Sequence, residues 1–382
     1  MRPALTSRRP LASTAARLLA LSTLVVACAG DDSGGSEATS ESSSASTTDT
    51  TSTTATTDAT TDATTDATTT SSTDATSTSS TDTTSTTSTT STSESTSTTD
   101  TTTSDTDPGI ECDALPPAPI PAEPVTMVFD GSEDLAFDGL GHLAGKSGDG
   151  VVLVDAADAV TPLASPVPKA YGLRYTVGGD LVVALPNDGK LLSITPGGQI
   201  SDLLTGLQGP NGVFPDLGGA IWVTEFSGSR VIRRNPDATV DVIVSGGEAT
   251  SANGVVYDSK RALLFYTNYS SGRVARVPID DQGQPGAPSM VTMIPGSPDG
   301  IILDACGNLY AVNQGGSELY RVLLDDAGAA LGPAELLTTL PTNVANPQFG
   351  RGDGFDPMSL YLAGNPGVVY RVPVGVPGIE IP

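Results

Sequence analysis

The chain has 382 residues, a formal net charge of −26 and only 4% aromatic residues. Residues 29–111 contain 15 acidic and no basic residues, which leaves residues 112–382 with 29 acidic and 14 basic residues, a net charge of −15. An acidic domain repels phosphate groups, so we expect no nucleic acid and no anionic lipid surface as a direct partner, and cations are favoured.

The first 28 residues have the order of an export signal. A start with four Arg residues precedes a short apolar stretch, Leu18–Val26, which cannot span a bilayer as a helix. Cys28 follows small residues and resembles the lipidated cysteine of a bacterial lipobox; an ordinary secretory signal with a chance cysteine is the alternative. The lipobox interpretation predicts a protein anchored in the bacterial cell envelope, at the outer membrane or cell surface, with the lipid as its only membrane contact.

Residues 29–111 are almost entirely Thr, Ser, Asp and Ala. Such a segment cannot bury enough apolar surface to offset its chain entropy, so we expect it to be disordered. A flexible chain of this length has a mean reach on the order of 50 Å. The composition therefore predicts a tether between the lipid and a folded domain at 112–382.

Two cysteines remain after the tether, Cys112 at the start of the domain and Cys306 near its end. An even number of cysteines in an exported chain favours a disulfide, which here would join the end of the tether to the fold. Two buried free thiols are the alternative.

A short sequence motif recurs six times through residues 112–382. A pair of residues ending in Gly leads into an apolar strand, an acidic turn and a second strand. The clear copies are Pro210-Asn211-Gly212-Val213, Ala252-Asn253-Gly254-Val255 and Pro298-Asp299-Gly300-Ile301, and weaker copies begin at Glu133, Tyr171 and Gln348. Successive copies start 38, 39, 42, 46 and 50 residues apart, a period typical of a propeller.

Each copy can be divided into four strands by its alternation and its turn residues. In the third copy we expect strands at 212–214, 220–225, 230–234 and 240–244, and no helical periodicity is found after residue 112. The sequence therefore predicts an all-β, six-bladed β-propeller with four antiparallel strands per blade. Segments 125–129 and 368–374 are expected to share one blade and so to close the ring.

The placed elements resemble the senescence-marker-protein (regucalcin)/gluconolactonase family. The resemblance runs from Glu133–Asp138 through the three clear copies to Phe349-Gly350 and Val372–Val376, and it covers residues 125–378. It implies a six-bladed propeller and a divalent-metal-dependent hydrolase of lactones or similar esters. Paraoxonases and strictosidine-synthase-like proteins share this fold.

The resemblance implies metal ligands at Glu133, Asn253 and Asp299, with Asn211 beside them. Independently, carboxylate and amide oxygens from different blades would form an all-oxygen site, which suits Ca²⁺ or another divalent ion. Each Asn-Gly or Asp-Gly pair taken singly is a turn signal, but the four together predict a metal site. Under the family mechanism Asp299 is ligand and general base, Glu133 holds charge on the ion, and Asn211 orients the substrate.

The sequence departs from the family pattern at one position. Family lactonases that bind sugar acids place an Arg two residues before the residue that aligns with Asn211, and this chain has Gly209 there. The only histidine, His142, cannot form the histidine pair of a paraoxonase-like site, and we expect it to be a structural strand residue. The missing Arg puts sugar-lactone specificity in doubt.

Two functions from different classes remain open. The first is a gluconolactonase-like, metal-dependent hydrolase on a membrane tether, which the four polar site residues favour. The alternative is a non-catalytic tethered propeller that binds a small-molecule ligand or a protein partner at its channel mouth, which Gly209, the lone His142 and the long tether favour. A protein scaffold without metal is a third option, against which the acidic cluster argues. We expect a monomer in each case.

Overall fold

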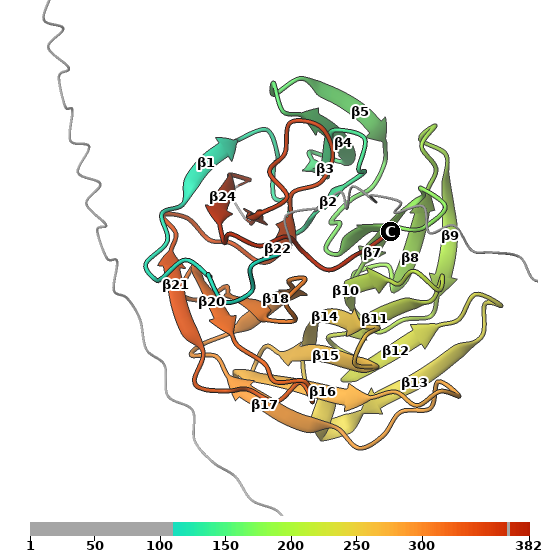
Figure 1. Ribbon diagram of the computed structural model, residues 1–382. Helices are drawn as coiled ribbons and strands as arrows, with labels where there is room; N and C mark the ends of the chain where they lie inside the picture. The colour runs from blue at the N-terminus through green and yellow to red at the C-terminus, as the bar shows by residue number, and fades with distance from the viewer. Residues whose placement is uncertain (1–109, 365–366) are drawn as a thin grey trace, which may run out of the picture. The chain divides into compact units, whose positions relative to one another are not determined.

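The computed structural model describes residues 110–364 and 367–382, which form six four-stranded antiparallel sheets. Figure 1 shows these sheets as blades around a common centre, so the predicted six-bladed propeller is confirmed. The predicted signal with Cys28, and the predicted tether as far as residue 109, lie outside the described residues. Within the described chain, no helix has both the length and the apolar character needed to cross a membrane.

The first three blades each use four consecutive strands, ordered from the axis outward. Blade 1 contains β2 (Leu135–Phe137), β3 (His142–Ser147), β4 (Gly150–Asp155) and β5 (Val160–Ala164). Blade 2 contains β6 (Leu173–Tyr175), β7 (Leu181–Leu185), β8 (Lys190–Ile194) and β9 (Ile200–Thr205). Blade 3 contains β10 (Pro210–Pro215), β11 (Ile221–Glu225), β12 (Arg230–Arg234) and β13 (Val240–Ser245), which confirms the four strands predicted for the third copy.

Blades 4 and 5 repeat this order, and blade 6 borrows a strand. Blade 4 contains β14 (Ala252–Asp258), β15 (Leu263–Asn268), β16 (Arg273–Pro278) and β17 (Ser289–Met293), preceded by one 3-10 turn, Gly246–Ala249. Blade 5 contains β18 (Pro298–Leu303), β19 (Leu309–Asn313), β20 (Glu318–Val322) and β21 (Glu335–Thr339). Blade 6 contains β22 (Asn346–Phe349), β23 (Ser359–Ala363), β24 (Val369–Pro373) and β1 (Glu123–Thr126).

The borrowed strand closes the ring. β1 pairs antiparallel with β24, and Glu123 lies opposite Arg371 in the register. The same two residues form an ion pair of 2.6 Å. The predicted closure, in which the start of the domain completes the blade formed by its end, is therefore confirmed.

Aspartate side chains fix the turns between first and second strands. In blade 3, Asp216 Oδ1 accepts a hydrogen bond from the Ala220 amide at 2.9 Å, and Asp216 Oδ2 accepts one from Trp222 Nε1 at 2.9 Å. Gly219 has a φ of +83°, a conformation that glycine adopts without a Cβ penalty. Asp304 organises the corresponding turn of blade 5 in the same way. The acidic turn of the sequence repeat is thus a hydrogen-bonded structure.

Apolar side chains fill the spaces between neighbouring blades. Trp222 of blade 3 stacks on Tyr257 of blade 4, with ring centroids 4.7 Å apart. Phe137 of blade 1 contacts Tyr361 of blade 6 edge-on at 5.1 Å, which joins the first and last blades. Full burial of a large side chain contributes about 2–3 kcal/mol. This packing holds the inner strands in fixed positions around the axis.

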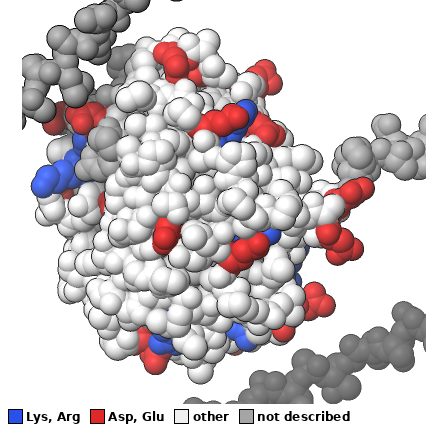
Figure 2. All heavy atoms as spheres, turned by 90° about the vertical axis from the view of Figure 1, so that its left-hand side faces the viewer, with Lys and Arg blue, Asp and Glu red and all other residues white. Residues whose placement is uncertain are grey.

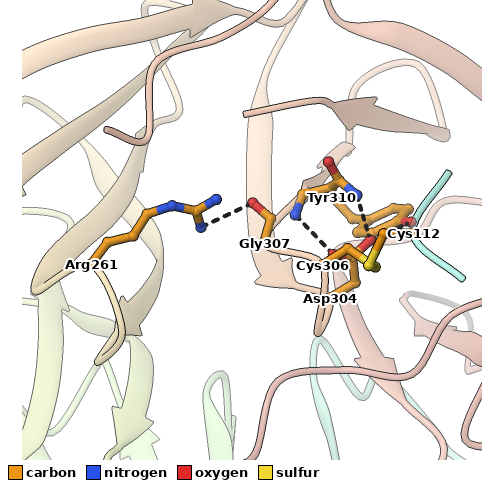
Figure 3. The surroundings of a disulfide bond; sticks show 7 residues. Cys112, Arg261, Asp304, Cys306, Gly307 and Tyr310 are labelled. Atoms are coloured by element: carbon orange, nitrogen blue, oxygen red, sulfur yellow. Dashed lines mark hydrogen bonds between the residues drawn. A yellow bond between two sulfur atoms is a disulfide. The ribbon is translucent and has the colours of Figure 1, made fainter. Parts of the chain in front are cut away.

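Both ends of the described chain are fastened to the first turn of blade 5. Cys112 and Cys306 form a disulfide with their Cα atoms 5.6 Å apart, as Figure 3 shows. From the other end, the Ala305 amide donates to the carbonyl oxygen of Pro377 at 2.8 Å. The turn that carries Cys306 therefore holds the entry and the exit of the domain.

Charged side chains are dispersed on the surface. Figure 2, which looks onto the left-hand side of Figure 1, shows separate acidic groups, several of them beside Lys or Arg. Exposed ion pairs such as Arg371–Glu123 contribute only about 0–1 kcal/mol to stability. On this face the acidic excess is spread out and does not form one continuous patch.

Candidate functional site

The four predicted site residues gather at one end of the propeller axis. Asn211, Asn253 and Asp299 are each the second residue of an innermost strand, β10, β14 and β18, and their exposures are 5%, 3% and 0%. Glu133 stands two residues before β2. Glu133, Asn211 and Asn253 line one cavity, and Asp299 is close enough to Glu133 for their charges to interact. Residues from four blades therefore meet at the axis.

The glycine that follows Asn211, Asn253 and Asp299 explains why the sequence motif repeats. A Cβ on Gly212 would overlap the carbonyl oxygen of Asn253 in the next blade, and a Cβ on Gly254 would overlap that of Asp299. Only glycine permits so close an approach between inner strands. The Asn-Gly and Asp-Gly pairs are therefore contacts between blades, and their repetition carries the polar side chains around the axis.

Threonines on the second strands lock this arrangement. The Gly254 amide donates to Thr267 Oγ1 at 2.7 Å, and the Thr267 hydroxyl donates to the Asp299 carbonyl oxygen at 2.7 Å. In blade 3, the Thr224 hydroxyl makes the corresponding bond to the Asn253 carbonyl oxygen. Each threonine thus ties its own blade to the backbone of the next site residue.

The sixth copy of the motif differs from the prediction. The residue of the neighbouring blade that contacts Gly300 is Asn346, two positions before the predicted start at Gln348. Asn346 Nδ2 donates to the Glu133 carbonyl oxygen at 3.1 Å, which joins blade 6 to blade 1. Pro347 follows Asn346 where the other copies have glycine, so the repeat pattern could not locate this position.

The cavity has a volume of about 360 Å³. Besides the site residues, Tyr171 and Gly209 contribute to its wall. The loops after the second strands of blades 2 to 5 supply the remaining lining residues, which are Pro186, Asn187, Phe226, Ser227, Tyr269 and Gln314. The sequence analysis did not identify these loop residues, although each loop follows its second strand directly.

Asp134, next to Glu133, has both a cationic partner and backbone hydrogen-bond donors. Arg174 of blade 2 forms an ion pair with it. The amides of Leu135 and Leu173 donate to its two oxygens at 2.8 and 3.0 Å. Burial raises the pKa of Asp134, while Arg174 and these backbone donors oppose the rise. This residue and its cation were not predicted as part of the site.

Glu133 and Asp299 lack such partners. Among the described residues, no Lys, Arg or His forms an ion pair with either of them. Burial, together with the Asp134 charge, raises the pKa of Glu133 to about 7. Burial and the charges of Glu133 and Asp134 raise the pKa of Asp299 well above its usual range. Without a cation the two carboxyl groups therefore resist ionisation together.

A short relay orients Glu133. The Tyr269 hydroxyl donates to Gln314 Oε1 at 2.7 Å, which leaves the amide nitrogen of Gln314 as the donor toward Glu133. That contact lowers the pKa of Glu133 in part. Tyr269 and Gln314 come from blades 4 and 5, so the position of Glu133 depends on three blades.

The buried oxygens left without a partner fit a cation. Glu133 Oε2, Asn253 Oδ1 and both Asp299 carboxylate oxygens accept no hydrogen bond from the residues that the structure describes. A buried acceptor without a donor costs about 1–3 kcal/mol, and a hard divalent cation would satisfy all four. No three His, Cys, Asp or Glu side chains within residues 110–364 and 367–382 group closely enough to hold a metal. An ion here therefore needs amide oxygens besides the two carboxylates, a donor set that suits Ca²⁺.

His142 lies away from this cavity. It belongs to the turn at the far end of β2, where its Nδ1 lies 2.7 Å from Asp138 Oδ2. Asp138 also accepts hydrogen bonds from the Leu140 and His142 amides. The pair therefore stabilises a turn, which agrees with the structural role expected for His142.

The chain is similar in sequence to two curated lactonases. It is 27% identical over 242 residues to a 6-deoxy-6-sulfogluconolactonase of Pseudomonas putida, a match that covers 56% of this chain and 78% of that enzyme. It is 26% identical over 206 residues to a pentonolactonase of Haloferax volcanii, covering 48% and 67% respectively. No family model matches the chain.

Solved structures share the fold. A gluconolactonase of Xanthomonas campestris superposes with a TM-score of 0.56 at 19% identity, covering 67% of this chain and 89% of that one. A calcium-binding regucalcin of Agrobacterium tumefaciens superposes with a TM-score of 0.56 at 16% identity, covering 69% and 97%. The predicted resemblance to the regucalcin/gluconolactonase propellers is thereby confirmed.

Proposed function

We propose that the protein hydrolyses small lactones in the cavity formed by Glu133, Asn211 and Asn253. The observation that carries this proposal is the pair of buried carboxyl groups, Glu133 and Asp299, which have no cationic partner within the described part of the chain and present unpaired oxygens there. Buried carboxyls with strongly raised pKa values in a cavity are typical of catalytic or metal sites. The sequence similarity to sugar lactonases supports the same reaction class.

Glu133, Asn211, Asn253 and Asp299 would hold a divalent metal ion, with Ca²⁺ as the best match to their oxygens. A divalent ion bound there would polarise the carbonyl group of a lactone. The regucalcin that shares this fold is a calcium-binding protein. The ion would also give the two carboxylates the positive charge that the described side chains do not supply.

Residues of the chain itself would perform the remaining steps of the reaction. Asn211 lines the cavity and orients the lactone through its amide group. Asp299 is fully buried and close enough to Glu133 for their charges to interact. Under this proposal it takes the proton from a water in the cavity, and that water adds to the lactone carbonyl carbon. Cleavage of the ring C–O bond then returns the proton to the ring oxygen and gives the hydroxy acid. Glu133 contributes negative charge at the cavity wall.

Turnover of aldonolactones by the full chain tests this proposal. With Ca²⁺ present, acid release measured with a pH indicator should exceed the spontaneous rate, and Asp299→Asn should lower kcat at least about 100-fold. Asp216→Asn, in a turn remote from the cavity, is the matched control. Acid release at the spontaneous rate by the folded, Ca²⁺-loaded protein would contradict a hydrolase.

The alternative is a tethered propeller that binds a ligand without converting it. Gly209 favours this alternative, because no arginine stands where family lactonases anchor a sugar acid. A ligand that raises the Tm of the Ca²⁺-loaded protein, with no acid release over hours, would be the result expected of it. The two functions are thus separated by turnover and not by binding.

The predicted export signal and the predicted tether support a place in the bacterial cell envelope. Under this proposal Cys28 carries a lipid and the folded domain acts as a monomer at the end of a flexible segment. Cys28→Ser should move the protein from the membrane fraction to the soluble fraction and abolish labelling by a fatty acid. Retention of Cys28→Ser in the membrane fraction would contradict the lipid anchor.

A further inference from the structure

The wall of the site cavity carries no positive charge. Among the described residues that line it, Glu133 is the only one with an ionisable carboxyl or basic group, and none is Lys or Arg. Lys169 precedes the lining residue Tyr171 by two positions, but it is exposed and lies outside the wall. A negatively charged group on a bound molecule would therefore find no counter-ion among the described side chains of the wall.

Three basic residues at this end of the blades already have acidic partners. The third strands of blades 2, 3 and 4 begin with Lys190, Arg230 and Arg273, directly after the loops that line the cavity. Lys190 lies 2.9 Å from Asp202, and Arg230 lies 2.6 Å from the fully buried Glu225. Arg273 pairs with Glu248. Turning any of these cations toward a ligand would break an ion pair.

The absence of an arginine at Gly209 is fixed by the backbone. Gly209 has a φ of +64°, and a Cβ there would lie 2.7 Å from Ser227 Oγ. Its carbonyl oxygen accepts a hydrogen bond from the Phe226 amide at 2.8 Å. The turn Phe226–Ser227 thus occupies the space that a side chain at position 209 would need.

Several side chains of the cavity wall are aromatic or neutral polar groups. Phe226 packs edge-on against Tyr269, with ring centroids 5.8 Å apart, and Tyr171 contributes a third ring to the wall. Asn187 and Ser227 offer hydrogen bonds without charge. Such walls suit the apolar faces and the hydroxyl groups of an uncharged ring.

Resting on the proposed function, we propose that this cavity accepts uncharged lactones and discriminates against lactones that carry a sulfonate, phosphate or carboxylate. The turn Phe226–Ser227 determines this specificity, because it closes position 209 to any cationic side chain. The related enzyme from Pseudomonas putida is named for a sulfonated lactone, so the two proteins would divide the substrate class by charge.

Binding of stable lactam analogues tests this inference separately from turnover. The probes are the δ-lactam of a neutral six-carbon sugar and the same lactam with a sulfonate on carbon 6, titrated calorimetrically into the Ca²⁺-loaded full chain. The neutral lactam should bind at least about tenfold more tightly, since no Lys or Arg among the described lining residues can pair with the sulfonate. Ser227→Lys should reduce that preference to about twofold or less, and Ser227→Thr should keep it.

Equal or tighter binding of the sulfonated lactam by the wild-type chain would overturn the inference. Failure of the neutral lactam to bind would also overturn it. An unchanged preference in a folded Ser227→Lys variant would also overturn it, because the added cation would then not face the ligand. Hydrolysis of the neutral lactone, measured on the same samples, reports on the proposed function. Tight neutral binding without hydrolysis would refute the hydrolase and leave the charge preference standing.

Discussion

Two neighbouring acidic residues of blade 1 behave in opposite ways. Asp134 has a cation, Arg174, and backbone donors for both of its oxygens. Glu133 is adjacent in the chain, yet its Oε2 has no partner, and Asp299 in blade 5 leaves both carboxylate oxygens unpaired. The paired acid joins two blades, whereas the unpaired acids have the properties of a binding site. The difference lies in the available partners, since all three groups are acids in buried surroundings.

The largest expected effect on stability comes from breaking the paired acid. Arg174→Met would leave Asp134 buried and charged without a counter-ion, and should lower the free energy of unfolding by about 3–5 kcal/mol. Urea unfolding of the metal-free chain measures this. Adding Asp134→Asn should recover part of the loss. A loss below about 1 kcal/mol in the single variant would show that the ion pair does not hold the blades.

The unpaired acids should make the metal-free protein less stable as the pH rises. The pKa of Glu133 is about 7 in the folded chain against an ordinary value of 4.5. The folded state therefore binds the Glu133 proton more tightly than the unfolded state does. The contribution of this proton to the free energy of unfolding is complete below pH 4.5, and it is lost as the pH rises to about 7. The loss amounts to about 3 kcal/mol.

Chelated wild-type protein and Glu133→Gln can be compared by thermal unfolding between pH 4.5 and 8. The wild-type Tm should fall relative to the variant over this interval, and saturating Ca²⁺ should remove the difference in slope. Parallel curves in the absence of metal would contradict the buried, unpaired state of Glu133.

Asp216 is an acidic residue in a turn at the opposite end of the blades, and its replacement should have a smaller effect on the free energy of unfolding. Asp216→Asn weakens the bonds from Ala220 and Trp222 and should lower the free energy of unfolding by about 1–2 kcal/mol. The response of the Tm to Ca²⁺ should stay unchanged, because Asp216 lies in the turn beyond β10. A lost response to Ca²⁺ would mean that the two ends of the blade are coupled.

The smallest expected effect concerns the relay to Glu133. Tyr269→Phe removes the hydroxyl that fixes Gln314 and should weaken Ca²⁺ binding by about 1 kcal/mol, roughly fivefold. Calorimetric titration with Ca²⁺ measures this, and Tyr257→Phe, which keeps the stacking on Trp222, is the matched control. Equal affinities in the wild type and Tyr269→Phe would remove Tyr269 from the site.

The sequence predicted the fold and the convergence of the four site residues because the same local signals recur in the blades. Asn211, Asn253 and Asp299 each precede a glycine that the neighbouring blade requires. The prediction placed the start of the sixth copy at Gln348, two positions after Asn346, because proline and not glycine follows Asn346.

The cavity wall and the pairing of charges could not be predicted in this way. Phe226, Tyr269 and Gln314 come one residue after their second strands, and nothing local distinguishes them from outer turn residues. The pairing of Asp134 with Arg174 joins residues 40 positions apart in different blades. Which acid obtains a partner depends on contacts between blades, and no single repeat contains that information.

The most direct test of the account is a Ca²⁺ titration of the chelated full chain, followed by its Tm. At a hundredfold excess over Kd the ion should add about 2.7 kcal/mol, a Tm rise of roughly 5–10 °C. Asn253→Ala and Asp299→Asn should abolish the rise, while Asp216→Asn should retain it. No rise with Ca²⁺, Mn²⁺, Zn²⁺ or Mg²⁺ would contradict the account, because the unpaired oxygens of Glu133, Asn253 and Asp299 would then not form a metal site.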